Sequence, residues 1–185
     1  MKKYLNISVA SFLVLVWSMA APAADMSYHI GPGDVLEISV WKDESLSRQV
    51  IVPPDGVISF PLIEDIRVTG MTVPDLREAV ALKLKDYFPD PTVTVMLVQI
   101  NSLKGYVIGK VNNPGQFPIE LDTNVMQILA MAGGLNPFAS PNSIFILRQQ
   151  EGKSIKIPFH YKQVEKGKHL EENIVLKRGD VVVVP

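Results

Sequence analysis

The sequence has no cysteine among its 185 residues. This absence excludes disulfide-stapled scaffolds, thiolate metal sites, a cysteine nucleophile and the attachment of a lipid to a cysteine. Its 18 Lys and Arg residues nearly balance its 19 Asp and Glu residues, so the formal net charge is −1. Because a nucleic-acid binder needs a basic face for the phosphates, we expect no nucleic-acid partner. Aromatic residues are few, at 8%, but a hydrophobic share of 47% supports a packed core and excludes disorder along the whole chain.

The long hydrophobic run of the sequence lies at its beginning. Lys2 and Lys3 precede an apolar run over residues 5–20, and Ala21-Pro22-Ala23 follows it. A charged start, an apolar middle and an A-x-A end indicate a secretory signal peptide over residues 1–23. An uncleaved membrane anchor is the alternative, but the run is short and interrupted by polar residues for a span of ~20 residues. We therefore expect export, cleavage of this segment and no lipoprotein processing, and no later segment that could cross a bilayer as a helix.

Strands and one helix are predicted between residues 28 and 100. Alternating apolar and polar residues over Leu36–Val40 predict a half-buried strand. The turn signal Asp55-Gly56 predicts a hairpin between strands 49–52 and 57–60. A further strand is expected over 92–98.

The helix of this first half is predicted from its capping residues. Thr72 is a good N-cap, Pro74 suits the first turn, and Pro89 and Pro91 are expected to stop the helix. The apolar stripe that we expect to face the core comprises Leu76, Ala79, Val80, Leu84 and Tyr87.

The second half also combines strands with one helix. Asn124 predicts a helix N-terminus, and Gly133-Gly134 predicts its end in a left-handed conformation. The apolar stripe of this helix is Val125, Ile128, Leu129 and Ala132. The expected strands are 106–108 and 116–121 around a turn at 112–115, a hairpin of 143–147 with 155–159, and a central closing strand at 180–184.

The fold class is therefore α+β, with two small strand-rich units that each contain one main helix. We divide the chain into a signal peptide at 1–23, a first domain at 24–101 and a second at 102–185. No Gly/Ser-rich linker separates the two domains, so we expect them to pack closely.

Several different short motifs follow one another along the two halves in a characteristic order. They are Gly31-Pro32-Gly33-Asp34, Asp55-Gly56, Gly70-Met71-Thr72, Gly109, Pro114-Gly115, Ala132-Gly133-Gly134 and Gly179-Asp180. In this order they resemble the polysaccharide export (Wza-like) family. Residues 24–101 resemble its export domain, and residues 102–185 resemble its soluble-ligand-binding β-grasp (SLBB) domain, closed by a C-terminal strand.

The resemblance implies a noncatalytic component of exopolysaccharide or capsule export without a cofactor. Its implied partners are further copies of itself in a ring, the exported polysaccharide and an inner-membrane chain-length regulator (a polysaccharide co-polymerase). Larger members complete an outer-membrane pore with a C-terminal amphipathic helix, and the family pattern includes a lipid-bearing cysteine. This sequence has neither, so we expect a periplasmic, outer-membrane-associated ring or adaptor, with a separate outer-membrane pore as a further candidate partner.

The motif residues themselves suggest structural roles. Their glycines stand where the chain turns or where a helix ends. We expect Asp34 and Asp180 to accept hydrogen bonds from their own backbone N–H groups, as Asp does in turns. Contact with a ligand is the alternative for each of them.

Catalytic chemistry is not indicated. A glycosidase needs two facing carboxylates, and the acids that offer such pairs fall mostly in predicted turns: Glu37, Asp43, Glu44, Asp55, Glu64 and Asp65. His29, His160 and His169 lack metal-ligand spacing, and the basic residues at 162–178 are interleaved with acids, which predicts a solvated face.

Trp41 is the one tryptophan that remains after signal-peptide cleavage. Packing in the core or at a subunit interface is one interpretation of this residue, and contact with a glycan is the other. The rival functions are a monomeric glycan-binding module and an adaptor between the chain-length regulator and a separate outer-membrane pore.

Overall fold

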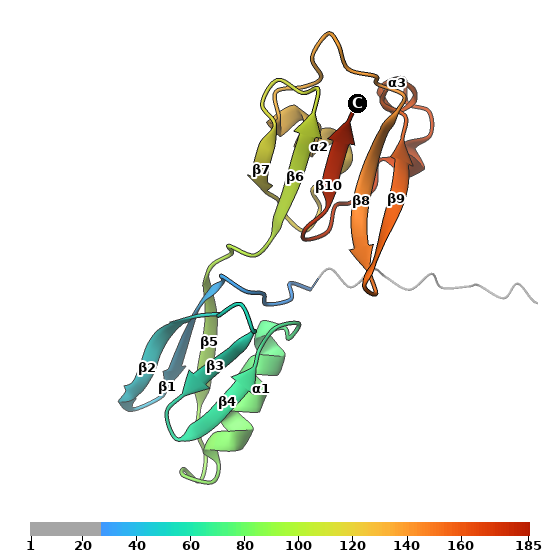
Figure 1. Ribbon diagram of the computed structural model, residues 1–185. Helices are drawn as coiled ribbons and strands as arrows, with labels where there is room; N and C mark the ends of the chain where they lie inside the picture. The colour runs from blue at the N-terminus through green and yellow to red at the C-terminus, as the bar shows by residue number, and fades with distance from the viewer. Residues whose placement is uncertain (1–26) are drawn as a thin grey trace, which may run out of the picture.

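The computed structural model describes residues 27–185, and the predicted signal peptide lies outside this range. Figure 1 shows two lobes joined by an extended passage between the strands β5 (Val93–Gln99) and β6 (Lys104–Gly109). Each lobe encloses its own cluster of buried apolar residues. Our expectation that the halves pack closely was wrong, because each half completes a separate core. The described polar contacts between the halves are confined to the place where they meet, formed by residues 28–34, 100–103 and 177–180, which we call the junction.

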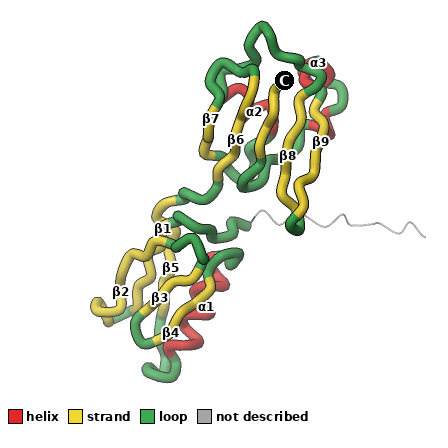
Figure 2. The backbone as a smooth tube through the Cα atoms, in the orientation of Figure 1, coloured by secondary structure: helices red, strands yellow, loops and turns green. Residues whose placement is uncertain are grey.

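The first half consists of two small sheets and a helix. Strands β2 (Asp43–Ile51), β1 (Val35–Val40) and β5 form an antiparallel sheet in that order, and β3 (Val57–Phe60) pairs with β4 (Ile63–Arg67) in a separate hairpin. Helix α1 (Val73–Leu84) packs against β5. Figure 2 shows this succession of strands interrupted by one helix.

The hairpin predicted around Asp55-Gly56 was wrong in its partners. The turn exists, with Gly56 at φ +74° and the Val57 N–H donating to Asp55 Oδ1 over 3.1 Å, but it leads from one sheet to the other. The segment before it instead pairs with β1, through a two-residue turn at Trp41-Lys42. Pro53 and Pro54 lack the N–H groups that would continue a ladder. Strand β4 was not predicted from the sequence. Its hairpin turns at Leu62 (φ +68°), and leucine is not a residue type that signals a turn.

Helix α1 begins as its capping residues predict. The Asp75 N–H donates to Thr72 Oγ1 over 3.3 Å and the Thr72 N–H donates to Asp75 Oδ2 over 3.0 Å, which forms a capping box. The buried stripe is confirmed at Leu76, Val80 and Leu84. Tyr87 does not belong to the stripe, because the helix ends at Leu84 and Tyr87 lies beyond it, 55% exposed. Within the described residues, no helix is both apolar enough and long enough to span a bilayer.

The second half is a five-stranded mixed sheet with its main helix on one face. The strand order is β7-β6-β10-β8-β9, and β10 is parallel to β6 and antiparallel to β8. The remaining elements are β7 (Gly115–Pro118), α2 (Val125–Met131), β8 (Ile144–Gln150), β9 (Lys153–Phe159), α3 (Tyr161–Glu165), the 3-10 helix η1 (Leu170–Glu172) and β10 (Val181–Val184). A helix packed on a mixed sheet with a central parallel pair is the β-grasp-like arrangement, and the α+β class is confirmed.

The local predictions in this half hold. Asn124 caps α2 through a capping box with Gln127, and all four residues of the apolar stripe are buried. Gly133 and Gly134 end the helix at φ +76° and +80°. The predicted closing strand β10 is central in the sheet.

Candidate functional site

Asp34 joins the beginning of β1 to the junction between the halves. Its buried carboxylate accepts hydrogen bonds from the N–H groups of Gly31 (2.8 Å), Asn101 (3.0 Å) and Ser102 (2.9 Å). The hydroxyl groups of Ser102 (3.0 Å) and Tyr28 also donate to it. The predicted bond to its own turn is therefore confirmed, and the additional donors fix the chain where it passes into the second half.

These hydrogen-bond donors determine the protonation state of the Asp34 carboxyl group. Burial raises the pKa of Asp34, but the hydrogen bonds from Tyr28, Gly31 and Ser102 outweigh it and hold the pKa below its usual value. Burial and the bond to Asp34 raise the pKa of Tyr28 to about 12. The pair therefore consists of an ionised carboxylate and a protonated phenol at neutral pH.

Asp180 occupies the corresponding turn before β10. Its Oδ2 accepts the N–H of Lys177 over 2.8 Å, which confirms the predicted bond to its own turn. Arg148 on β8 pairs with this carboxylate through Nη2 (2.6 Å) and Nε (3.0 Å). The ion pair lies within the second half, with 13% of the Arg148 side chain and 1% of that of Asp180 exposed.

Arg178 connects the two turns across the junction. Its Nη2 donates to the carbonyl oxygen of His29 over 2.6 Å. A Cβ placed on Gly31 would lie 1.9 Å from Arg178 Nη1, so the missing side chain at Gly31 leaves room for the guanidinium. Although the sequence placed Arg178 on a solvated face, it takes part in this contact between the halves.

The motifs of the first half meet near the beginning of β1. The N–H of Gly70 donates to Ile30 O, and the N–H of Gly33 donates to Val52 O. The carbonyl of Gly56 accepts the N–H groups of Val68 and Thr69. Pro32 lies in the same turn as Gly33, and Thr72 follows Gly70 as the α1 cap. These motif residues thus hold one set of turns together.

The motifs of the second half meet at the end of the sheet away from the junction. The N–H of Asn112 donates to Gly134 O, and that of Asn113 to Ala132 O. Gly109, at φ +96°, passes so close to β10 that an added Cβ would lie 2.0 Å from Val184 O. Pro114 and Gly115 complete this set of turns, and Gly115 has open space around it.

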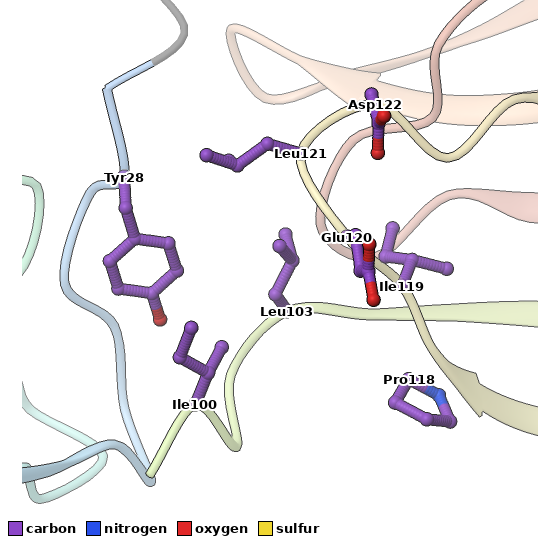
Figure 3. A pocket seen from close by; sticks show the side chains of 8 residues that line it. All are labelled: Tyr28, Ile100, Leu103, Pro118, Ile119, Glu120, Leu121 and Asp122. Carbon is purple, nitrogen blue, oxygen red and sulfur yellow. The ribbon is translucent and has the colours of Figure 1, made fainter. Parts of the chain in front are cut away.

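A pocket of about 410 Å³ lies beside the junction. Figure 3 shows Tyr28 and Ile100 on one side and residues 118–122 on the other, with Leu103 between them. Its walls are mainly apolar, with Glu120 and Asp122 adding carboxylates. The geometry admits a ligand of mixed character, and nothing in it resembles a catalytic constellation.

Trp41 lies at the tip of the β1–β2 hairpin, 73% exposed. Packing in the core of this chain is therefore wrong, whereas packing at a subunit interface and contact with a glycan both remain predictions. The indole borders a groove of about 330 Å³ with Ser39, Thr92 and Thr94. Strand β1 ends at Val40, so Trp41 belongs to the turn that follows the strand.

The acids and histidines considered for catalysis make local contacts. Asp43 binds Ser45, Asp65 accepts the hydroxyl of Ser59, and Glu37 accepts the side-chain amide of Gln49. His160 Nδ1 lies 2.9 Å from Glu172 Oε1. Over residues 27–185, no group of three or more acids and histidines is placed to hold a metal ion.

Four residues of these sites were missed from the sequence: Tyr28, Asn101, Ser102 and Arg148. Asn101, Ser102 and Arg148 lie far along the chain from the carboxylate that each contacts. Tyr28 lies only six residues from Asp34, but no role was assigned to it from the sequence. A buried Asp needs donors, so the sequence signalled that partners existed but not which residues they were.

The comparison with family models identifies both halves. Residues 22–98 match the model described as polysaccharide biosynthesis/export protein, and residues 105–158 match the SLBB domain. The chain therefore carries a domain of the polysaccharide biosynthesis/export type, followed by an SLBB domain.

Curated relatives support the same assignment of the two domains. The EPS I polysaccharide export outer membrane protein EpsA of Ralstonia nicotianae is 28% identical, over 85% of this chain and 47% of its own length. The polysialic acid transport protein KpsD of Escherichia coli is 30% identical over 60% of this chain and 20% of its own. The capsule polysaccharide export outer membrane protein CtrA of Neisseria meningitidis is 24% identical over 82% of this chain and 43% of its own length. The chain thus spans less than half the length of these relatives.

Proposed function

We propose that this protein is a noncatalytic component of exopolysaccharide or capsule export that forms part of an oligomeric conduit for the polymer. The observation that carries the proposal is the succession of an export domain and an SLBB domain along one chain. The names of the relatives, which describe export proteins for such polymers, support the same class of cargo.

The proposed location is the periplasm in association with the outer membrane, reached through a cleaved signal peptide. The charged, apolar and A-x-A segments of residues 1–23 support export. Two of the relatives are named outer membrane proteins, which supports the association. The proposed partners are other copies of the chain, the polysaccharide and an inner-membrane chain-length regulator.

Self-association is supported by the uncovered face of the five-stranded sheet. Figure 1 shows α2 behind this sheet, with the other face open. The register of β6, β10 and β8 places one set of apolar side chains on the open face: Tyr106, Ile108, Phe145, Leu147, Val181 and Val183. Tyr106 is 37% exposed and Ile108 is 48% exposed. A contiguous apolar patch of this kind is typical of an interaction surface.

Deletion and complementation test the export function. Loss of the gene should abolish extracellular polymer while polymer still accumulates inside the cell, as measured by sugar analysis of the two fractions. The gene restored in trans should return export. Unchanged extracellular polymer after deletion would refute the function.

A matched pair of variants tests the conduit. Ile108→Asp puts a charge in the open sheet face, whereas Leu82→Asp puts one at an exposed position (65%) on α1. Light scattering of the purified chain should show multimers for the parent and Leu82→Asp and a smaller species for Ile108→Asp. If the parent is a monomer at every concentration, the conduit is excluded and the monomeric glycan-binding alternative is favoured.

A further inference from the structure

We propose that the tip of the β1–β2 hairpin is a contact site for uncharged pyranose residues, with Trp41 as the surface on which the sugar ring stacks. The proposal rests on the proposed export function for its biological meaning, but its chemistry is independent of it. It assigns a ligand class to a groove outside both the junction and the motif turns.

The turn holds the Trp41 backbone in a defined place. Val40 pairs with Asp43 across a two-residue loop, and Lys42 adopts φ +64°. The N–H of Trp41 donates to Thr92 O over 2.9 Å, which ties the tip to the segment that precedes β5. A non-glycine residue in the left-handed region costs free energy, and such conformations cluster at functional sites.

The indole is exposed although its apolar surface favours burial. Trp41 is 73% exposed, whereas the apolar residues of the same hairpin that face inward, Ile38 and Val40, are buried. Burial of an aromatic side chain stabilises a protein, and the fold leaves this contribution unused at Trp41. A ligand that covers the ring would recover part of it.

The groove beside the indole carries the polar groups that a sugar needs. Ser39, Thr92 and Thr94 contribute hydroxyl groups, and Lys42, Asp43 and Glu44 contribute charged groups. The electron-rich face of an aromatic ring attracts the partly positive C–H groups of a pyranose. Hydroxyl groups around it can donate hydrogen bonds to the equatorial sugar hydroxyls or accept them, and carboxylates can accept them. An apolar platform with a few convergent polar groups is the usual form of a small-molecule site.

The charges of the groove select among sugars. Two carboxylates, Asp43 and Glu44, face one ammonium group, Lys42, so that the groove has a net negative charge. A uronic acid or sialic acid residue would bring a further carboxylate into this field and be repelled. We therefore infer that neutral hexose residues bind here and that acidic ones are disfavoured.

Tryptophan fluorescence tests the site directly. The sequence contains two tryptophans, Trp17 and Trp41. In full-length chain carrying Trp17→Phe, Trp41 is the only indole, and its emission reports on the groove. The protein is titrated with cellohexaose and maltohexaose as neutral probes and with hexagalacturonate as the acidic probe.

We expect a saturable blue shift with at least one neutral hexasaccharide and a response at least tenfold weaker with hexagalacturonate. In isothermal titration with the neutral sugar, the parent chain should give a binding heat, and Trp41→Ala should remove it. The matched control Phe138→Ala, which truncates another exposed aromatic residue (78%), should leave it unchanged.

Three outcomes overturn the proposal. The first is no response to either neutral sugar, and the second is stronger binding of hexagalacturonate. The third is an emission shift that follows protein concentration without sugar, which would make Trp41 a contact between copies of the chain. Binding with unchanged export in the deletion strain would refute the proposed function and leave the site intact, so the two failures are distinguishable.

Discussion

The two Gly-Asp turns of this protein share one local structure and differ in what surrounds them. In each, a left-handed glycine (Gly33 at +92°, Gly179 at +80°) precedes an aspartate that feeds a central strand. In each, the carboxylate accepts the N–H three residues earlier, over 2.8 Å. The Gly-Asp pair that occurs in both halves of the sequence therefore forms the same piece of backbone twice.

The partners of the two carboxylates are different. Asp34 is surrounded by neutral donors, two of which, Asn101 and Ser102, belong to the junction. Asp180 is paired with the cation Arg148 inside the second half. The same turn thus anchors the connection between the halves in one case and closes a single core in the other. A short motif defines a turn, and its tertiary neighbours define its role.

Loss of the Asp180 carboxylate should lower the stability of its half more than any other of these substitutions. Asp180→Ala leaves the guanidinium of Arg148 (13% exposed) without its carboxylate, and unpairing a buried charge costs about 3–5 kcal/mol. Native-state hydrogen exchange should show lost protection in β6, β10 and β8, with β1 unchanged. In the double variant Arg148→Met/Asp180→Ala, the loss should be smaller. Equal loss in both halves would contradict the independence of the two cores.

Asp34→Asn should have the next largest effect, because its amide cannot accept from all the donors around it. Each hydrogen bond to a charged group contributes about 1.5–3 kcal/mol. We expect faster exchange at Asn101 and Ser102 and in β1, with β10 unchanged. Glu37→Gln, at a half-buried position of the same strand, serves as the control. Protection unchanged at the junction would refute its anchoring role.

The shared backbone predicts equal effects at the two glycines. Gly33→Ala and Gly179→Ala each force a Cβ into the left-handed region, at a cost of about 1–2 kcal/mol. An added Cβ meets at most ordinary contact at either site, so strain alone decides the cost. Gly115→Ala, in open space without a positive φ, should change stability by less than about 0.5 kcal/mol. A large difference between the first two, measured by exchange in their own halves, would break the equivalence of the turns.

The smallest expected effect is a change in the pH dependence of stability, confined to the first half. The folded pKa of Asp34 lies below its usual value, so its contribution to stability is complete above about pH 4 and is lost as the pH falls through the folded pKa. Tyr28→Phe removes a donor and should bring the folded pKa closer to the usual value. Less of this contribution is then available, and its loss still begins near about pH 4 but ends at a higher pH. Acid unfolding followed by exchange in β1 measures the shift, with the exposed Tyr87→Phe as control. An unchanged acid profile would mean that the phenol does not stabilise the carboxylate.

Much of the fold was predictable because its signals are local. Thr72 and Asn124 cap their helices, and Glu151-Gly152 joins β8 to β9 with both residues at positive φ. Which strands pair with one another was less predictable. The Asp55-Gly56 turn was correctly located, yet its strands belong to different sheets, because pairing depends on which edge is already occupied.

The candidate site divides in the same way. Trp41 was identifiable as a lone tryptophan, but its exposure followed only from the hairpin that places it at a tip. The motif glycines were identifiable as turn residues. That Gly31 makes room for Arg178 from the other half could not be known from either segment.

The sequence alone determined the helix caps, the left-handed glycines and the two aspartate turns, since each depends on the side chain and backbone of a few neighbouring residues. Only the tertiary structure decided that Asp34 meets the junction, that Asp180 meets Arg148 and that the two cores remain separate. These contacts join residues tens of positions apart. Their free energy depends on how whole sheets and helices bury their surfaces, which no short stretch of sequence encodes.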